Sequence, residues 1–130
     1  MSDLIFVYGT LMSHTGTPKA VQLAAEADSL GAATIAGTLY RISWYPGLGE
    51  GAGTVHGEVF RLRAPAASLA WLDAYEGIVP GDADRNRNEY ERVQRPVMLA
   101  DGRRLDAWVY LYRADVSGCS PVADGRWTTP

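Results

Sequence analysis

Most of the hydrophobic pattern in this chain has the period and length of β-strands. Residues 4–8 form an apolar run rich in β-branched and aromatic side chains, which predicts a short buried strand that ends at Gly9. Residues 30–44 mix apolar and polar positions over a longer span, which predicts one long strand bent at Gly31 or Gly37. The first part of the chain is therefore expected to supply two strands of very different length.

The strand pattern continues further along the chain. Residues 54–62 and 89–99 alternate between apolar and polar side chains, as half-buried strands do. The Asp101-Gly102 step that follows predicts a tight hairpin turn. Residues 105–112 return as a strand with apolar or aromatic side chains on both faces. That composition predicts a central strand of the sheet.

Two segments have helical spacing instead. Thr17 can cap a helix that has Pro18 at its first position, and this helix is expected to run to about Ser29. Pro65 starts the second helix, which is expected to end at Gly77, where glycine suits a left-handed cap. Hairpin-connected strands with two helices predict an α+β fold built on a small, mostly antiparallel, barrel-like sheet.

Three stretches have no such period. The glycine-rich residues 47–53 have the composition of a nucleotide-binding loop, but a strand rather than a helix follows them, so we expect an ordinary loop without a nucleotide. The Tyr-Pro-Gly step at 45–47 predicts a turn, and residues 80–88 predict a charged, solvated loop. The tail at 113–130 shows no period.

Composition narrows the class of protein. With 130 residues, of which 47% are hydrophobic, the chain is expected to form one globular domain over 1–130. A net charge of −3 argues against nucleic-acid binding, and no apolar run is long enough to span a membrane. One cysteine, Cys119, and the absence of a signal-peptide pattern predict a cytoplasmic protein. Cys119, His14 and His56 do not make a metal-ligand set, so no metal is expected.

The turn after the first strand is one candidate for chemistry. A strand that ends in a tight glycine turn gathers the backbone N–H groups of Gly9, Thr10 and Leu11. Such a group of amides suits a carboxylate or a developing oxyanion. The alternative is an ordinary turn without a ligand.

Glu76 is the second candidate. It falls at the C-terminal end of the predicted second helix, where the helix dipole disfavours a negative charge. Apolar neighbours flank it, so burial and the dipole would together raise its pKa. The alternative is a solvated glutamate in a fraying last turn.

An ordered set of short motifs adds a resemblance to a known family. The motifs, in chain order, are Val7-Tyr8-Gly9-Thr10-Leu11, Gly37-Thr38-Leu39-Tyr40, Tyr45-Pro46-Gly47, Val55-His56-Gly57-Glu58-Val59-Phe60, Leu72-Asp73-Ala74-Tyr75-Glu76-Gly77, Tyr90-Glu91-Arg92 and Ala107-Trp108-Val109-Tyr110. This series resembles the γ-glutamylcyclotransferase-like family, which includes γ-glutamylamine cyclotransferases and the plant avirulence-induced-gene-like (AIG2-like) proteins. The resemblance covers residues 4–112 and implies a small β-barrel with helices packed on it.

The resemblance also implies a site and a reaction. Residues 8–11 (Tyr8, Gly9, Thr10 and Leu11) would bind the substrate, and Glu76 would act as general acid and base. The family reaction turns a γ-glutamyl amine or peptide into 5-oxoproline and a free amine. The substrate brings its own nucleophile, so no cofactor and no metal is required. Tyr90 and Tyr110 are further candidates for substrate binding, with a core position as the alternative for each.

Several alternatives stay open at this point. Residues 12–18 lack the asparagine that members active on γ-glutamyl-amines often carry after the binding loop, which leaves the leaving amine undefined. The same pocket could serve a binding module that holds a small carboxylate without turnover. A third option is removal of a γ-glutamyl protecting group in a biosynthetic pathway. The oligomeric state is likewise not defined by the sequence.

Overall fold

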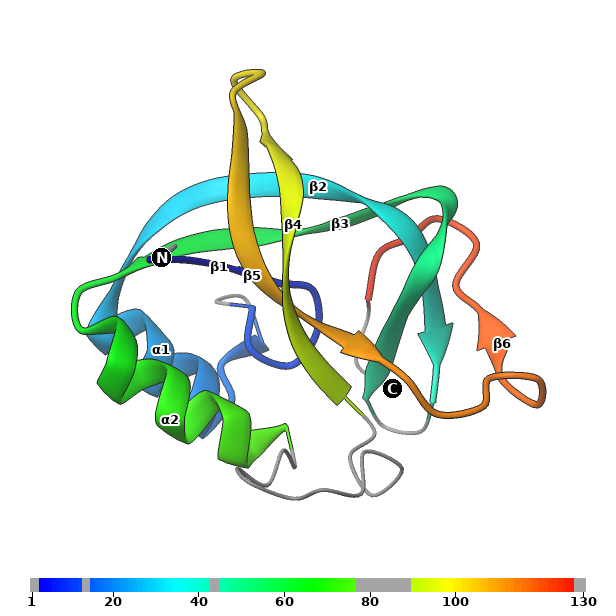
Figure 1. The fold of residues 1–130 in the computed structure, drawn as a ribbon, viewed down its shortest axis with the longest axis horizontal. Coiled ribbons are helices and arrows are strands. Elements are labelled where there is room, and N and C mark those ends of the chain that lie inside the picture. Colours follow the sequence, from blue (N-terminus) through cyan, green and yellow to red (C-terminus); the bar gives the residue numbers. More distant parts are fainter. Residues whose placement is uncertain (1–2, 13–14, 43–44, 77–89, 128–130) are drawn as a thin grey trace.

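The computed structural model describes residues 3–12, 15–42, 45–76 and 90–127, which form a β-barrel flanked by two helices (Figure 1). In chain order the elements are β1 (Leu4–Val7), α1 (Pro18–Glu26), β2 (Ala27–Arg41), β3 (Pro46–Leu62), α2 (Pro65–Tyr75), β4 (Tyr90–Leu99), β5 (Arg104–Tyr112) and β6 (Ser120–Pro121). The predicted Gly77 cap and the predicted loop at 80–88 lie outside the described residues.

The strands form one sheet in the order β1-β3-β5-β4-β2-β6, and β2 also pairs with β3. That extra pairing closes β2, β3, β5 and β4 into a ring, and β1 joins it between β3 and β5. The pairings of β1 and β3 with β5 are parallel and the rest are antiparallel. The predicted α+β class and the mostly antiparallel barrel are confirmed.

The long second strand bends where glycine was expected to bend it. The register of β2 against β3 shifts between Ser29 and Gly31 and again between Ala36 and Thr38, on either side of Gly37. These irregularities let a single strand wrap around the barrel, because a bulge increases local twist and bends the chain.

The expected loop at 47–53 is wrong, because residues 46–62 form the continuous strand β3. The turn expected at 45–47 comes slightly earlier, because antiparallel β2 and β3 already pair at Arg41 and Pro46 and the chain reverses between these two residues. Within β3, glycine serves close packing rather than chain reversal. A Cβ on Gly51 would lie 2.5 Å from Thr38 Oγ1, and one on Gly53 would lie 2.9 Å from the Gly37 carbonyl oxygen. The glycines thus allow β3 to pass close to β2 at its second bulge.

The two helices lie side by side at one end of the barrel, at the lower left of Figure 1. The Thr17 hydroxyl caps α1 by accepting a 3.2 Å hydrogen bond from the Ala20 amide, as the sequence predicted. The Glu26 carboxylate at the end of α1 accepts hydrogen bonds from Ser68 Oγ (2.7 Å) and Trp71 Nε1 (2.8 Å). This carboxylate fastens α1 to α2.

The core fills the inside of the barrel and the space beneath the helices. Its largest fully buried side chains come from β1, β2, β3, α1, α2, β4 and β5, namely Phe6, Phe60, Ile5, Leu23, Leu39, Leu48, Leu72, Val55, Val59, Val97 and Val109. The central position predicted for β5 is confirmed, because it pairs with β4 on one side and with β1 and β3 on the other.

The β4–β5 hairpin projects beyond the barrel (Figure 1), and its turn is the predicted Asp101-Gly102 step. Gly102 has φ +91°, and its amide donates a 2.9 Å hydrogen bond to the Leu99 carbonyl. Only glycine adopts this φ without strain, which explains the turn.

The tail docks on the barrel although its sequence shows no period. β6 pairs with the end of β2, and the Val122 amide donates a 2.7 Å hydrogen bond to the Leu39 carbonyl. Trp127 is buried, with the Arg41 guanidinium 4.4 Å from its ring centroid. A short strand pairing, a backbone hydrogen bond and one buried aromatic side chain therefore hold the tail on the barrel.

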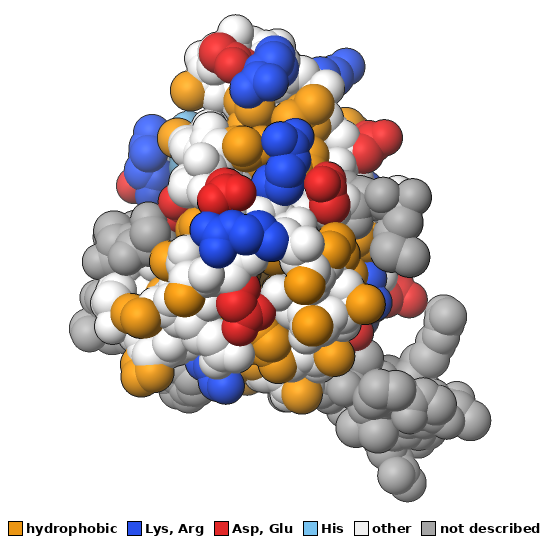
Figure 2. Space-filling model, turned by 90° about the vertical axis from the view of Figure 1, so that its left-hand side faces the viewer, with side chains coloured by type: hydrophobic (Ala, Val, Ile, Leu, Met, Phe, Trp, Pro, Cys, Tyr) orange, Lys and Arg blue, Asp and Glu red, His pale blue; other side chains and the backbone are white. Residues whose placement is uncertain are grey.

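Acidic and basic side chains are interspersed on the face of the molecule seen in Figure 2, rather than gathered by sign. Within the described ranges, no helix is long and apolar enough to cross a membrane. The same ranges hold no group of three or more His, Cys, Asp or Glu side chains that could bind a metal ion.

Candidate active site

A cavity of about 230 Å³ opens where the loop after β1, the end of α2 and strands β4 and β5 meet. It is lined by Phe6, Val7, Tyr8, Gly9, Thr10, Leu11, Tyr45, Pro46, Tyr75, Glu76, Tyr90 and Tyr110. Every residue that the sequence nominated for a site is in this set. The glycine turn and the helix-end glutamate, which are far apart in the chain, thus face one hollow.

The loop at 8–11 is shaped by a tight turn against β3. The Met12 amide donates a 3.1 Å hydrogen bond to the Gly9 carbonyl, which closes the turn. A Cβ on Gly9 would lie 2.6 Å from Pro46 Cγ, so the side chain of any other residue would displace Pro46. In the part of the chain that the structure describes, the amides of residues 9–11 donate no backbone hydrogen bond. Residues 9–11 line the cavity, so their amides are the candidates for binding an anion there.

The Thr10 carbonyl fixes the orientation of this loop from behind. It accepts 2.8 Å hydrogen bonds from the hydroxyls of both Thr15 and Thr17. The Thr10 hydroxyl in turn bonds the Tyr75 hydroxyl at 2.8 Å, which connects the loop to the last turn of α2. The loop is therefore held in place before any ligand arrives.

Glu76 is the C-cap of α2, and its amide donates to the Leu72 carbonyl at 3.0 Å. Its side chain is half-buried and lines the cavity. Burial, and next the negative charge of Asp73, raise its pKa to about 7. Among the described residues, no donor bonds this carboxylate. The group can therefore both give and take a proton near neutral pH.

The hydroxyls of Tyr8 and Tyr90 bond backbone groups of the protein, which the sequence did not predict. The Tyr8 hydroxyl donates to the Tyr110 carbonyl at 2.6 Å and accepts from the Leu48 amide at 3.2 Å. Burial and the nearby Glu76 raise the pKa of Tyr8 well above its ordinary value, so it stays neutral. The Tyr90 hydroxyl donates to the Pro46 carbonyl at 2.6 Å.

A charged group lies behind Tyr110. The Tyr110 hydroxyl donates a 2.7 Å hydrogen bond to Asp73 Oδ1. Arg92 donates to the same carboxylate from Nε (2.8 Å to Oδ1) and Nη2 (3.3 Å to Oδ2), and its guanidinium lies 4.4 Å from the Trp108 ring centroid. Burial, with the negative charges of Asp73 and Glu76, raises the pKa of Tyr110 well above its ordinary value.

Sequence reasoning did not nominate Asp73, Tyr75, Tyr45 or Pro46 for the site. Asp73 had a usable signal, because it precedes Glu76 by three residues and so shares its side of the helix. Tyr75 bonds the loop through its hydroxyl, and Tyr45 packs 6.4 Å from Tyr90 between ring centroids. Only the fold places these two side chains at the cavity.

Comparison with known proteins places this arrangement among relatives. Residues 5–129 match the family model described as gamma-glutamyl cyclotransferase, AIG2-like. The gamma-glutamylcyclotransferase family protein YtfP of Escherichia coli (strain K12) is 36% identical over 127 residues, which cover 95% of this chain and 94% of that protein. The family match includes the tail, which the ordered motifs did not reach.

Solved structures agree with the fold. The solution structure of YtfP from Escherichia coli superposes with a TM-score of 0.66 at 35% identity and covers 95% of each chain. YkqA from Bacillus subtilis gives a TM-score of 0.69 at 21% identity, and this chain spans 40% of it. An AIG2-like protein from Mus musculus gives 0.61 at 22% identity, over 84% of this chain and 76% of that one.

Proposed function

This chain belongs to the gamma-glutamyl cyclotransferase, AIG2-like family, and we propose that it cyclises the γ-glutamyl group of a small amine or peptide to 5-oxoproline, with Glu76 as general acid and base. The observation that carries the proposal is the position of Glu76. Its carboxyl group lines the same cavity as the amides of residues 9–11, and its pKa is about 7.

The reaction needs only proton transfers from the protein. The ionised Glu76 takes a proton from the α-ammonium group, and the freed amine attacks the γ-carbonyl carbon of the same molecule. A C–N bond closes the five-membered lactam, the C–N bond to the leaving amine breaks, and Glu76 returns its proton to the leaving nitrogen. The ring nitrogen gives up its second surplus proton, which the released amine takes up, so that the amine leaves as an ammonium ion. Attack within one molecule makes the step unimolecular, so positioning contributes much of the rate.

The environment of Glu76 suits both roles. A carboxyl group with an ordinary pKa near 4.5 would hold too little proton at neutral pH to protonate a leaving nitrogen. Burial in the cavity wall raises the pKa toward the working pH, and the same group then serves as base and as acid.

We expect the loop at residues 9–11 to bind the negatively charged part of the substrate. Its amides can hold the substrate α-carboxylate, or the oxyanion that forms on the γ-carbonyl oxygen. The Tyr8 hydroxyl is already bonded to two backbone groups, so Tyr8 contributes to the shape of the cavity next to this loop rather than a free hydrogen-bond donor. The substrate class that fits is a small γ-glutamyl compound.

The test is the Glu76→Gln variant, which keeps the shape of the side chain and removes its proton transfer. Release of 5-oxoproline from a panel of γ-glutamyl amines and dipeptides should fall by roughly 10²–10⁴-fold. Glu26→Gln is the matched control, since Glu26 also ends a helix but bonds Ser68 and Trp71 away from the cavity. Unchanged turnover in Glu76→Gln would contradict the proposal, and wild-type protein that binds the panel without turnover would identify a binding module.

A further inference from the structure

Three of the tyrosine hydroxyls around the cavity donate their protons to other groups of the protein. A phenol has one O–H donor and keeps lone pairs as acceptors. The Tyr8 proton goes to the Tyr110 carbonyl, the Tyr90 proton to the Pro46 carbonyl, and the Tyr110 proton to Asp73 Oδ1. Toward a ligand, these three groups can therefore offer acceptors only.

For Tyr110 this direction is imposed by Asp73. An ionised carboxylate has no proton to donate, so the 2.7 Å contact requires Tyr110 to be the donor. Arg92 donates two further hydrogen bonds to Asp73, of 2.8 and 3.3 Å. Both side chains of this pair are largely buried, and Trp108 covers the guanidinium.

The residues that line the cavity differ in hydrogen-bonding character. Residues 9–11 carry backbone amide donors, whereas the Tyr110 hydroxyl oxygen and the Glu76 carboxylate are acceptors. A γ-glutamyl group has the matching asymmetry, because it carries an anionic carboxylate and a cationic ammonium on one carbon. The α-ammonium group is the part that needs acceptors.

We propose that Asp73 is a positioning residue: by taking the Tyr110 proton, it makes the Tyr110 hydroxyl oxygen an acceptor for the substrate α-ammonium, beside Glu76. This rests on the proposed function for the identity of the ligand. Asp73 is not in the cavity wall, so it acts through Tyr110. The ammonium is thereby held next to the carboxylate that must deprotonate it.

The test compares two ligands that differ only in the amino group, namely γ-glutamyl methylamide and its deamino analogue, glutaric acid monomethylamide. Their dissociation constants are measured by NMR titration in a Glu76→Gln background, where the amino ligand should remain intact. The Glu76→Gln protein without further substitutions should bind the amino ligand with a dissociation constant roughly 10-fold lower than that of the deamino ligand, because the deamino ligand cannot form the charge-assisted hydrogen bond. No preference, or no binding of the amino ligand, would overturn the proposal.

Three variants in that background separate Asp73 from its salt bridge. Arg92→Met alone should keep the preference, because Asp73 still accepts the Tyr110 proton. Adding Asp73→Ala to Arg92→Met should reduce the preference to within about 3-fold, while the affinity for the deamino ligand stays unchanged. Tyr110→Phe, which preserves the Asp73–Arg92 pair, should give the same reduction and guards against a folding defect in the double variant.

The outcomes have distinct meanings. A parallel loss of affinity for both ligands would indicate a structural role and overturn the proposal, as would a preference that persists without Asp73. Asp101→Asn is the matched control, because Asp101 pairs with Arg103 in the turn of the β4–β5 hairpin, which projects beyond the barrel (Figure 1). If the Glu76→Gln background releases 5-oxoproline as fast as wild type, the proposed role of Glu76 fails, whereas the ligand preference is a separate binding measurement that tests Asp73.

Discussion

Two glutamates end the two helices of this protein, and their environments are opposite. Glu26 is the last residue of α1, and Glu76 directly follows the last residue of α2. Both stand at the negative end of a helix dipole, which disfavours a carboxylate by up to about 1 kcal/mol. The pKa of Glu26 is nevertheless lowered, whereas that of Glu76 is raised to about 7.

The difference comes from burial and from hydrogen-bond donors rather than from helix position. Glu26 accepts from Trp71, from Ser68 and, within its own helix, from Gln22 Nε2 at 3.3 Å. Glu76 is half-buried without such donors among the described residues, and the charge of Asp73, which also acts on it, has the same sign. The Glu26 carboxylate is thus stabilised in its charged form and links the two helices, whereas the Glu76 carboxyl group is partly protonated near neutral pH.

The largest effect on folding is expected from the pH dependence of Glu76. Its pKa rises from 4.5 to about 7 on folding, so its contribution to stability is full below pH 4.5 and is lost as the pH rises toward 7. The loss amounts to about 3 kcal/mol at most. The Glu76→Gln variant should therefore gain stability relative to wild type between pH 4 and 8, as measured by urea unfolding across that range. A constant difference would show that Glu76 is not shifted.

Removing Glu26 should cost about 2 kcal/mol at neutral pH in the Glu26→Ala variant, because the buried Ser68 hydroxyl and the Trp71 N–H lose their acceptor. Glu26→Gln should cost less, since the amide oxygen still accepts. The pH dependence has the opposite sign to that of Glu76: the lowered pKa gives stability that is present above pH 4.5 and is lost in acid. Thermal melts at pH 3.5 and 7 measure both variants, and equal losses at the two pH values would contradict this.

The contrast between the two glutamates also marks what the sequence could predict. The Thr17-Pro18 helix start and the helix-end position of Glu76 depend on residues close in sequence, and both were found from the pattern. The donors to Glu26 come from α2, more than forty positions away. No local pattern identifies them, so the sequence gives the helix end but not the environment of its carboxylate.

The same physical limit explains the misassigned stretch at 47–53. Glycine-rich composition is typical of loops, but here β2 bends toward β3 and the missing side chains let the strands approach. At the site, motif order was enough to nominate residues 8–11 and Glu76. Asp73 had a local signal in its spacing to Glu76, but its contacts with Arg92 of β4 and Tyr110 of β5 could be seen only in the fold.

Asp73→Asn should lower the pKa of Glu76, but by less than burial raises it. Asp73 is the second cause of the raised pKa, so removing its charge should move the acidic limb of kcat/KM from near pH 7 to lower pH by less than one unit, worth less than about 1.4 kcal/mol. The measurement is the pH profile of 5-oxoproline release. Asp101→Asn should leave the limb in place, and a shift to higher pH in Asp73→Asn would contradict the charge effect.

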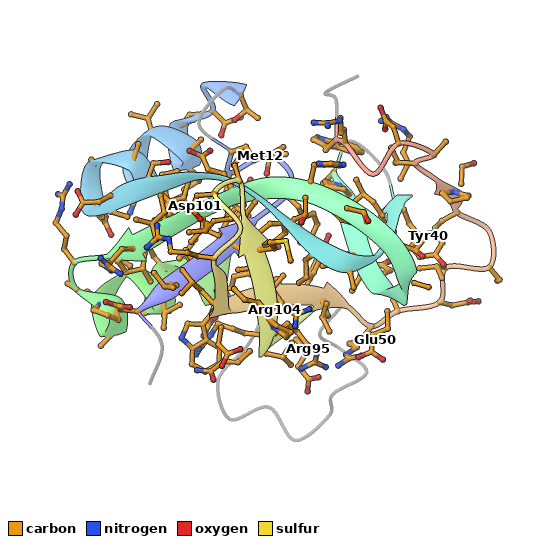
Figure 3. All side chains as sticks on the ribbon, turned by 90° about the horizontal axis from the view of Figure 1, so that it is seen from above. Met12, Tyr40, Glu50, Arg95, Asp101 and Arg104 are labelled. Carbon is orange, nitrogen blue, oxygen red and sulfur yellow. The ribbon has the colours of Figure 1, made fainter. Side chains whose placement is uncertain are left out.

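The smallest effect on the free energy of unfolding is expected from Glu50, an exposed glutamate that is neither bonded like Glu26 nor placed in a cavity wall like Glu76. Glu50 pairs with Arg95 on the surface at 3.0 Å, with side chains 65% and 38% exposed (Figure 3). Water screens such a pair, so Glu50→Gln should change the free energy of unfolding by less than about 1 kcal/mol, and by less still in high salt. Urea unfolding at low and high ionic strength measures this. A loss as large as that of Glu26→Ala would mean that donor count and burial do not set the contribution of a glutamate in this fold.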